Sequence, residues 1–443
     1  MNQSLKTSRG VSVSILSEIL ENGAYANIAL RKFLPQTKLD SRDRAFVTEL
    51  VNETLRNLLS IDYVINHFSK LPVSKMKPFI RNLLRVSVCQ LRHMDKVPQS
   101  AAVNEAVTLA KSHGFGGISG FVNGVLRAIA HSPLDPPLPD CGSADYLSRR
   151  YSYPSWLADA LVKWLGTDEA NKFCENSHLP PPVTVFVNTL KTTQDGLHKR
   201  LRAEGLDSTF LGDEFLILHQ AGDISGLPAF KEGLFFVMDP GAIWAVKALA
   251  LKPGQTVIDL CAAPGGKSFA AACQMGDTGQ INAFDIHPHR VSLIHESIKR
   301  LGLTSIQTNT KDATTYDTAF DSIADAVLID APCTGFGTIS KRPEIKYNRS
   351  PQDIETLAEV QKQMLSTGAR YVKKGGILVY STCTVAREEN IENIRWFLND
   401  HPFKLCQPLL PPPDISFLLE DNCLQIMPGM SNDGFFITSM IKF

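Results

Sequence analysis

The chain has 443 residues, 45 basic and 45 acidic side chains, and 44% hydrophobic residues. It is too long for one ordinary domain, and its composition is typical of a soluble globular protein. It has no apolar run of about 18 residues and no apolar segment at its N-terminus, which argues against a membrane protein and against secretion. Nine irregularly spaced cysteines without a Cys-x-x-Cys pair indicate reduced thiols, a cytoplasmic location and no structural zinc site.

The charge is unevenly distributed. Residues 1–131 contain 17 Lys and Arg against 9 Asp and Glu, whereas the remaining residues contain 28 against 36. A basic N-terminal third favours binding to a polyanion. Solvated helix faces of different composition would give the same asymmetry.

The first part of the chain predicts an all-α bundle followed by a linker. Apolar residues recur at helical spacing from residue 13, and Asp40 begins a segment typical of a capped helix. Further helices are expected at 79–94, 101–112 and 117–129. Residues 132–142 contain four prolines and predict a linker.

The rest of the chain predicts two further domains. Residues 143–236 mix helices, at 155–165 and 193–204, with strands, at 183–188 and 215–219, and indicate a small α+β module. In residues 237–443, short apolar strands alternate with helices, which predicts an α/β domain with a parallel sheet covered on both faces. The strands expected there are 256–260, 281–285, 306–309, 326–330 and 377–381, with helices near 266–274, 288–301, 351–373 and 387–399. A last strand, 435–440, should add antiparallel.

A ligand-binding loop follows the strand 256–260. It reads Cys261-Ala262-Ala263-Pro264-Gly265-Gly266-Lys267, and its small residues would let a ligand approach the backbone. A phosphate-binding P-loop would need glycine at position 261, and the dinucleotide pattern G-x-G-x-x-G is also absent. Neither ATP nor NAD is therefore the favoured cofactor.

Two aspartates suggest which cofactor the loop serves. Asp285 ends the second strand and is placed to accept hydrogen bonds from ribose hydroxyls. Asp312, after the third strand, could bind an adenine amino group. Ribose and adenine contacts without a phosphate loop suit S-adenosylmethionine. The alternative is that both aspartates only cap helices.

Two cysteines follow the ends of apolar strands. Cys333 comes after Asp330-Ala331-Pro332, and Cys383 comes after Ser381-Thr382. Two thiols at neighbouring strand ends suggest covalent catalysis with two sulfur atoms in one site. A free cysteine is usually a small buried hydrophobe instead, and this reading is preferred for Cys89, Cys174, Cys261 and Cys273.

Several motifs resemble the signature of the RNA cytosine-5 methyltransferases of the NOL1/NOP2/Sun family. They are Asp259-Leu260-Cys261-Ala262-Ala263-Pro264-Gly265-Gly266-Lys267, Asp330-Ala331-Pro332-Cys333-Thr334-Gly335, Ser381-Thr382-Cys383-Thr384, Arg342-Pro343-Glu344-Ile345-Lys346 and Asp433-Gly434-Phe435-Phe436. Residues 1–131, including Gln99-Ser100-Ala101-Ala102-Val103-Asn104-Glu105, resemble the antitermination factor NusB. The C-terminal domain is thus expected to be a Rossmann-like S-adenosylmethionine-dependent methyltransferase domain.

The resemblance implies a role for each motif. Cys383 would be the nucleophile that adds to carbon 6 of cytosine, Cys333 would assist release of the product, and Asp330 would engage N3. From the residues alone the two thiols cannot be ranked. No metal is expected. The predicted cofactor-binding residues are Cys261, Ala262, Ala263, Pro264, Gly265, Gly266, Lys267, Asp285, Arg290, Asp312 and Asp330.

The partner implied by the resemblance is 16S rRNA, bound by a monomer with no membrane contact. Arg42, Arg44, Arg81, Arg85 and Arg92 in the helical domain could pair with phosphates, or could form a solvated stripe. Two alternatives stay open: the same chemistry on another RNA such as tRNA, and a noncatalytic RNA-binding ribosome-assembly factor. Protein contacts through residues 1–131 also stay open.

Overall fold

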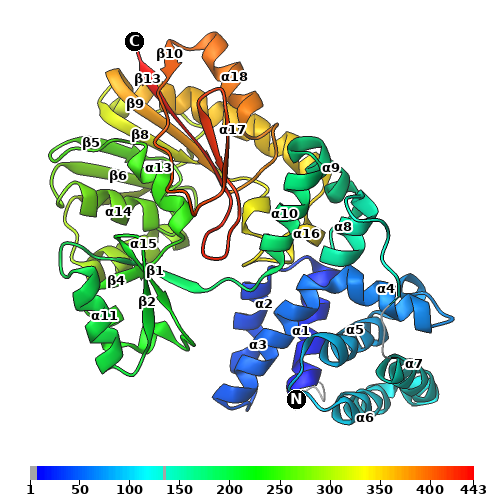
Figure 1. Ribbon diagram of the computed structural model, residues 1–443. Coiled ribbons are helices and arrows are strands. Elements are labelled where there is room, and N and C mark those ends of the chain that lie inside the picture. The colour runs from blue at the N-terminus through cyan, green and yellow to red at the C-terminus, as the bar shows by residue number, and fades with distance from the viewer. Residues whose placement is uncertain (1–6, 133–135) are drawn as a thin grey trace. The chain divides into compact units, whose positions relative to one another are not determined.

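The computed structural model describes residues 7–132 and 136–443 and divides into two compact units (Figure 1). Unit 1 runs to His178 and also contains Ile339–Ser350, and unit 2 comprises Leu179–Thr338 and Pro351–Phe443. A segment from the second half of the chain is thus built into the helical unit. The domain boundaries predicted above did not include this return.

Unit 1 is helical. Its central helix is α5, Pro78–His93, which carries proline at its first turn and buries 11 of its 16 residues. Asp40 caps α3 by accepting a hydrogen bond from the Asp43 backbone N–H, as the sequence predicts. The remaining α-helices of this unit are α1 (Ser8–Asn22), α2 (Ala26–Phe33), α3 (Ser41–Arg56), α4 (Leu58–Phe68), α6 (Gln99–Ala110), α7 (Ser119–His131), α8 (Ala144–Tyr151), α9 (Ser155–Leu165), α10 (Thr167–His178) and α16 (Ile345–Asn348).

The predicted linker, residues 132–142, follows α7. Its described residues, 132 and 136–142, contain no helix or strand, and residues 133–135 lie outside the described residues. The helices at 144–178 that follow pack within unit 1, whereas the strands of the predicted α+β module belong to unit 2.

A small four-stranded sheet opens unit 2. Its strand order is β2-β3-β1-β4, and all neighbours are antiparallel. Leu197 and Leu201 of α11 pack against strand residues such as Val185 and Leu216. This is the α+β module that the sequence predicts, with two strands, β2 and β4, that it did not predict. The elements are β1 (Val183–Val187), α11 (Gln194–Ala203), β2 (Ser208–Leu211), β3 (Phe215–Leu218), α12 (Pro228–Lys231) and β4 (Phe235–Val237).

The large sheet of unit 2 has nine strands in the order β11-β12-β13-β9-β8-β5-β6-β7, with β10 also paired to β13. The run β9-β8-β5-β6-β7 is parallel and β13 adds antiparallel to β9, so the predicted Rossmann-like fold is confirmed. The elements are α13 (Ile243–Lys247), β5 (Thr256–Asp259), α14 (Gly266–Gln274), β6 (Gln280–Asp285), α15 (Pro288–Leu301), β7 (Ile306–Thr310), β8 (Ala324–Asp330), α17 (Pro351–Tyr371), β9 (Val372–Thr382), α18 (Ile391–Asp400), β10 (Phe403–Leu405), β11 (Phe417–Glu420), β12 (Cys423–Ile426) and β13 (Phe435–Lys442).

Strand periodicity explains why helices cover both faces of this sheet. Alternate residues of β8 point to opposite faces, so Leu328 joins the core under α13, α14 and α15 while Val327 and Ile329 join the core under α17 and α18. All three residues are almost completely buried. The apolar run that suggested a buried strand is thus shared between two hydrophobic cores.

One predicted helix is wrong at its start. The helix expected at 387–399 begins at Ile391, because Asn390 has non-helical backbone angles (φ −111°, ψ −102°). Both Glu389 and Asn390 are buried instead of lying on a helix surface.

Candidate active site

The predicted cofactor loop connects β5 to α14 at the carboxyl end of the parallel sheet. Gly265 has φ 108°, and a Cβ atom there would lie 2.2 Å from the Phe269 ring, so the turn requires glycine. The Ala262 N–H donates to the Phe284 carbonyl on β6 at 2.7 Å. The loop is thereby held against the neighbouring strand.

Asp259, at the end of β5, holds the start of this loop to α14. It is 2% exposed and accepts a hydrogen bond from the Ser268 hydroxyl at 2.6 Å. Burial raises the pKa of Asp259 to about 6, although the bond from Ser268 opposes this rise. Asp259 is therefore built into the wall of the site and joins its loop to the first turn of α14.

The predicted ribose-binding carboxylate, Asp285, ends β6 and is buried. Its Oδ1 accepts from the His287 backbone N–H, and its Oδ2 lies 3.2 Å from Nη1 of Arg290. Arg290 also donates to the Ala263 carbonyl at 3.0 Å. In the structure Arg290 therefore braces the cofactor loop to Asp285.

Asp312 lies two residues beyond the end of β7, and β7 pairs with β6, the strand that ends at Asp285. Its Oδ1 accepts from the backbone N–H and the hydroxyl of Thr314, at 2.9 and 2.7 Å. Among the described residues no hydrogen bond to Oδ2 is seen. Two carboxylates at adjacent strand ends can accept hydrogen bonds from the hydroxyl and amino groups of an adenosine group. This pair of acceptors therefore fits S-adenosylmethionine.

Asp330 at the end of β8 contacts both the first turn of α14 and the end of β9. Its Oδ2 lies 2.6 Å from the Lys267 ammonium, and its Oδ1 accepts from the Ser381 hydroxyl on β9 at 2.8 Å. Burial lowers the pKa of Lys267, but the Asp330 carboxylate outweighs this effect and the pKa is raised overall. Lys267 is therefore a fixed cation between the cofactor loop and Asp330.

The two predicted cysteines lie side by side. The Sγ atoms of Cys333 and Cys383 are 3.2 Å apart, and the Cys383 backbone N–H lies 3.3 Å from Sγ of Cys333. The hydrogen bond with the Cys383 side chain is the largest of the effects that raise the pKa of Cys333 well above its ordinary value. Burial and the negative charge of Cys383 and Glu389 raise it further. Two sulfur atoms separated by 50 positions in the sequence therefore share one site.

The other cysteines singled out from the sequence lie elsewhere. Cys89, Cys174 and Cys273 are buried, as expected, whereas Cys261 is half-buried with its Sγ 3.9 Å from Sδ of Met364. Within residues 7–132 and 136–443, no group of three or more His, Cys, Asp or Glu side chains could hold a metal ion. Over the same residues, every helix is too short or too polar to cross a membrane.

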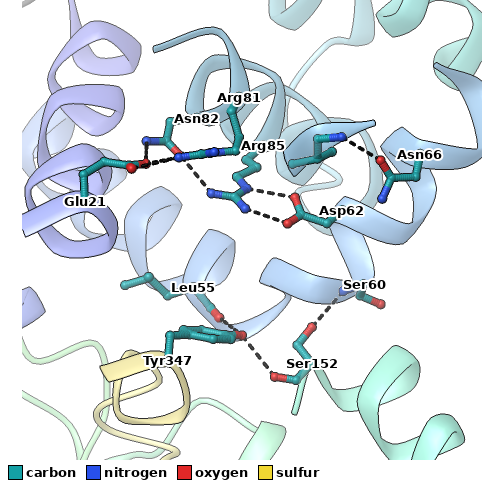
Figure 2. Close-up of polar contacts among 11 residues, drawn as sticks. Glu21, Leu55, Ser60, Asp62, Asn66, Arg81, Asn82, Arg85, Ser152 and Tyr347 are labelled. Atoms are coloured by element: carbon teal, nitrogen blue, oxygen red, sulfur yellow. Dashed lines mark hydrogen bonds and ion pairs between the residues drawn. The ribbon is translucent and has the colours of Figure 1, made fainter. Parts of the chain in front are cut away.

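Most of the candidate phosphate-binding arginines of unit 1 are already hydrogen-bonded to other residues of the chain. Arg85 donates from Nε and Nη2 to the two carboxylate oxygens of Asp62, at 2.8 and 2.6 Å. Arg81 donates from Nη2 to both carboxylate oxygens of Glu21, and Figure 2 shows both pairs. Both arginines line a cleft of about 620 Å³ within this unit. Arg92 donates to the Ile129 carbonyl. Arg85 is therefore a buried structural cation, which corrects its reading as part of a solvated or phosphate-binding stripe.

Sequence reasoning missed two residues next to the thiols. Glu389 and Asn390 hydrogen-bond to residues that flank Cys333 and Cys383, respectively. The only sequence signal was a pair of polar residues in the segment assigned to a helix after the Cys383 motif. Alone it does not distinguish a helix surface from a buried network.

Comparison with known proteins agrees with this arrangement. The description 16S rRNA methyltransferase RsmB/F matches residues 246–441, the NusB family matches residues 6–131, and the ferredoxin-like domain of RsmF/B-like methyltransferases matches residues 153–225. The chain is 38% identical to the probable ribosomal RNA small subunit methyltransferase B of Bacillus subtilis (strain 168), over 99% of each chain. It is 30% identical to ribosomal RNA small subunit methyltransferase B of Escherichia coli O7:K1, over 98% of each.

Solved structures give the same result. The crystal structure of PH0851 matches with a TM-score of 0.81 at 29% identity, covering 98% of this chain and 99% of that chain. A methyltransferase homolog protein from Pyrococcus horikoshii matches 67% of this chain and 98% of that chain, with a TM-score of 0.58 at 30% identity. Because the curated relatives match over essentially their full length, this chain belongs to the 16S rRNA methyltransferase RsmB/F family.

Proposed function

We propose that this protein transfers a methyl group from S-adenosylmethionine to carbon 5 of a cytosine in 16S rRNA, through a covalent adduct between Cys383 and carbon 6. The observation that carries this proposal is the pair of sulfur atoms 3.2 Å apart, next to a carboxylate fixed by Lys267 and Ser381. Pyrimidine carbon 5 is a poor nucleophile, and thiolate addition at the adjacent carbon solves this problem by dividing one hard step into two easier ones.

The first step is attack on the base. A bond forms between Sγ of the Cys383 thiolate and carbon 6, electron density moves through carbons 5 and 4 to N3, and N3 takes up a proton from water, so that its N–H can donate to a carboxylate. Asp330 is the residue proposed to engage N3, because its carboxylate is held in place by Lys267 and Ser381. The raised pKa of Cys333 supports the assignment of Cys383 as the attacking thiolate, since Cys333 then remains a thiol that can donate to it.

The second step is methylation and release. When bound, S-adenosylmethionine would supply a methyl group on a positively charged sulfur. Carbon 5 of the adduct would form a bond to this methyl group as the methyl–sulfur bond breaks, and the electron pair of that bond would stay on the sulfur, which leaves as a neutral thioether. N3 then gives its proton back to water and carbon 5 loses its proton to a base, the carbon 5–carbon 6 double bond returns, and the bond from carbon 6 to Sγ of Cys383 breaks with its electron pair on the sulfur. Cys333 is proposed to assist this release, since its sulfur contacts that of Cys383.

The remaining predicted residues are proposed to hold the cofactor. Asp285 would bind the ribose hydroxyls and Asp312 the adenine amino group, while Cys261, Ala262, Ala263, Pro264, Gly265, Gly266 and Lys267 form the loop beside them. Arg290 would act through the loop, because it bonds to Asp285 and to the Ala263 carbonyl. The relatives named as small subunit methyltransferases support rRNA over tRNA as the substrate. Residues 1–131 and 143–236 would place this RNA, in a monomer acting in the cytoplasm.

The experiment uses cells without this gene as a source of unmethylated RNA. The full-length protein and S-adenosylmethionine labelled in the methyl group are incubated with small ribosomal subunits, free 16S rRNA or tRNA, and the modified position is read by bisulfite sequencing. We expect label at one cytosine of 16S rRNA. Label in tRNA alone would change the substrate, and absence of label in every RNA would favour the noncatalytic assembly factor.

Cysteine variants test the covalent step. Cys383→Ala should abolish both methylation and the covalent RNA–protein adduct, because the attacking atom is removed. Cys333→Ala should methylate once and remain attached to RNA, as a shifted band on a denaturing gel. Cys141→Ala, which changes an exposed cysteine of unit 1, is the matched control and should behave as wild type. The opposite pattern would exchange the roles of Cys333 and Cys383.

A further inference from the structure

Two consecutive buried residues lie next to the cysteine pair, and each one contacts the loop that carries one of the two cysteines. Glu389 is fully buried, and Asn390 is 3% exposed. Burial of a carboxylate and an amide is costly unless their polar atoms are hydrogen-bonded. Where those hydrogen bonds go therefore indicates what the two side chains are for.

Glu389 holds the loop that carries Cys333. Its Oε2 accepts from the Thr334 backbone N–H at 3.0 Å and its Oε1 from the Thr334 hydroxyl. Oε2 also accepts from Gln361 Nε2 at 2.8 Å, and that same nitrogen donates to the Pro332 carbonyl at 2.9 Å. Both neighbours of Cys333 in the sequence are thus tied to Glu389, one directly and one through Gln361.

Asn390 holds the loop that carries Cys383 in the same way. Its Oδ1 accepts from the Thr382 hydroxyl at 2.6 Å, and its Nδ2 donates to the Thr384 carbonyl at 3.0 Å. Both neighbours of Cys383 are thus tied to Asn390. The two loops also meet directly, because the hydroxyls of Thr334 and Thr384 are 2.8 Å apart.

The segment that carries Glu389 and Asn390 is itself held in place by hydrogen bonds. The Tyr380 hydroxyl donates to the Glu389 carbonyl at 2.7 Å, and Asn393 donates to Oε1 of Gln361 at 2.9 Å. The non-helical conformation of Asn390 delays the start of α18 and lets both side chains point into the core. Adjacent residues on one rigid turn are thereby attached to two different loops.

We propose that Glu389 and Asn390 are positioning residues for the methyl transfer, with Glu389 setting the place of Cys333 and Asn390 that of Cys383. This inference rests on the proposed function for its catalytic consequence, but not for its geometry. Misplacing a reacting group by about 1 Å costs on the order of 100-fold in rate. The negative charge of Glu389 also helps to keep Cys333 a thiol, since it contributes to the raised pKa of Cys333.

The geometric part is tested without RNA. A fluorogenic reagent with two alkylating groups is added to the full-length protein, and the peptide bridging Cys333 and Cys383 is quantified by mass spectrometry. Wild type should form the bridge, because the sulfur atoms are in contact. Glu389→Ala and Asn390→Ala should each lower the ratio of bridged to singly alkylated product by roughly tenfold, because a loosened loop disperses one thiol.

Matched and conservative variants complete the geometric test. Glu392→Gln changes an exposed carboxylate three residues away on α18 and should leave the ratio as in wild type. If an alanine variant does not fold, Glu389→Gln or Asn390→Asp is measured in its place, because each of these variants retains the side-chain shape. No bridge in wild type, or an unchanged ratio in variants at both positions, would overturn the proposal.

The catalytic part separates the two residues. Glu389→Gln should accumulate the covalent RNA adduct, because release depends on Cys333, whereas Asn390→Asp should slow formation of that adduct. S-adenosylmethionine binding should stay within about threefold of wild type in both, since the hydrogen bonds described above join the two residues to the loops of Cys333 and Cys383; a merely structural defect would weaken binding and adduct formation together. Wild-type protein that bridges its thiols but methylates no RNA would refute the proposed function and leave the positioning intact.

Discussion

The Lys267 ammonium lies 2.6 Å from Oδ2 of Asp330, so the loop after β5 is bound to the end of β8. Ser381 of β9 donates to the other oxygen of the same carboxylate. The strand order β9-β8-β5 makes this possible, because the carboxyl ends of neighbouring parallel strands meet at one edge of the sheet. One carboxylate thus connects the cofactor loop to the strand end that leads into Cys383.

Lys267→Met should lower turnover by about 100-fold, because Asp330 would keep only its bond from Ser381 and lose its fixed orientation. The KM for RNA should change by less than about threefold, since the change affects the transition state more than binding. Steady-state kinetics with 16S rRNA measures both constants. Lys252→Met, at an exposed lysine of the same unit, is the control. Turnover equal to wild type would show that Lys267 does not orient Asp330.

Gly337→Ala should disturb Cys383 through the backbone. Gly337 donates its N–H to the Cys383 carbonyl, and a Cβ atom at this position would lie 2.2 Å from the Gly434 carbonyl oxygen and 2.9 Å from that of Cys383. Either the loop at 434 or the Cys383 loop must move, so the rate of adduct formation should fall by at least about tenfold. Gly222→Ala, where a Cβ atom meets nothing within 4 Å, should leave it unchanged. Equal rates in the two variants would contradict this.

The sequence predicted the parts of this protein whose signal is local. The strands around Asp330 and the helix 155–165 follow from periodicity and capping, and the pairing of Cys333 with Cys383 follows from the rule that parallel strand ends meet. The return of Ile339–Ser350 to the helical unit carries no such signal, because it depends on contacts far apart in the sequence. Glu389 was missed for the same reason: a glutamate near a helix start is ordinarily exposed, and only its bonds to Thr334 and Gln361 explain its burial.

The arginines of unit 1 show the limit of charge patterns. Arg85 recurs at helical spacing with Arg81, yet it is buried against Asp62. Arg85→Met should therefore destabilise unit 1, by about 3–5 kcal/mol, because it leaves the carboxylate of Asp62 without its partner. Arg42, exposed on α3, is available to a phosphate. Arg42→Gln should leave stability unchanged and reduce the slope of log affinity against log salt by about 1 if it contacts RNA.

Unfolding by denaturant and RNA binding at several salt concentrations, measured on both variants, separate these roles. If the Arg85→Met protein is stable and its log affinity for RNA has a reduced slope against log salt, Arg85 is part of the RNA-binding surface. A stable Arg42→Gln protein with an unchanged slope would remove Arg42 from it.

Lys346 is the buried lysine that anchors the segment Ile339–Ser350 in unit 1. It is 1% exposed, and its Nζ donates to the backbone carbonyls of Arg56 and Tyr151, both at 2.9 Å. Burial lowers the pKa of Lys346 to about 7, and the positive charge of Arg56 acts in the same direction. A neutral amine still has two N–H donors for its two carbonyl acceptors, so deprotonation does not break this anchor.

The lowered pKa gives the stability of unit 1 a defined pH dependence. An unfolded lysine titrates near ~10.4, so between about pH 7 and that value the unfolded chain binds one proton more than the folded chain. The free energy of unfolding should therefore rise with pH in this window, by up to ~1.4 kcal/mol per pH unit; this gain is lost as the pH falls from ~10.4 toward 7, and below 7 both states are protonated and the contribution of Lys346 is constant. Lys346→Met removes this titration and should lose most stability relative to wild type at the alkaline end.

Urea unfolding of the full-length protein, followed by hydrogen exchange at peptides of α5, measures this difference between pH 6 and pH 9. Taking wild type minus Lys346→Met at each pH cancels the contributions of the other titrating groups, because they are present in both proteins. Lys96→Met, at an exposed lysine of the same unit, should differ from wild type by a constant amount. If the difference for Lys346→Met is also constant with pH, the folded protein keeps Lys346 charged, and the two carbonyls then stabilise an ammonium ion rather than a neutral amine.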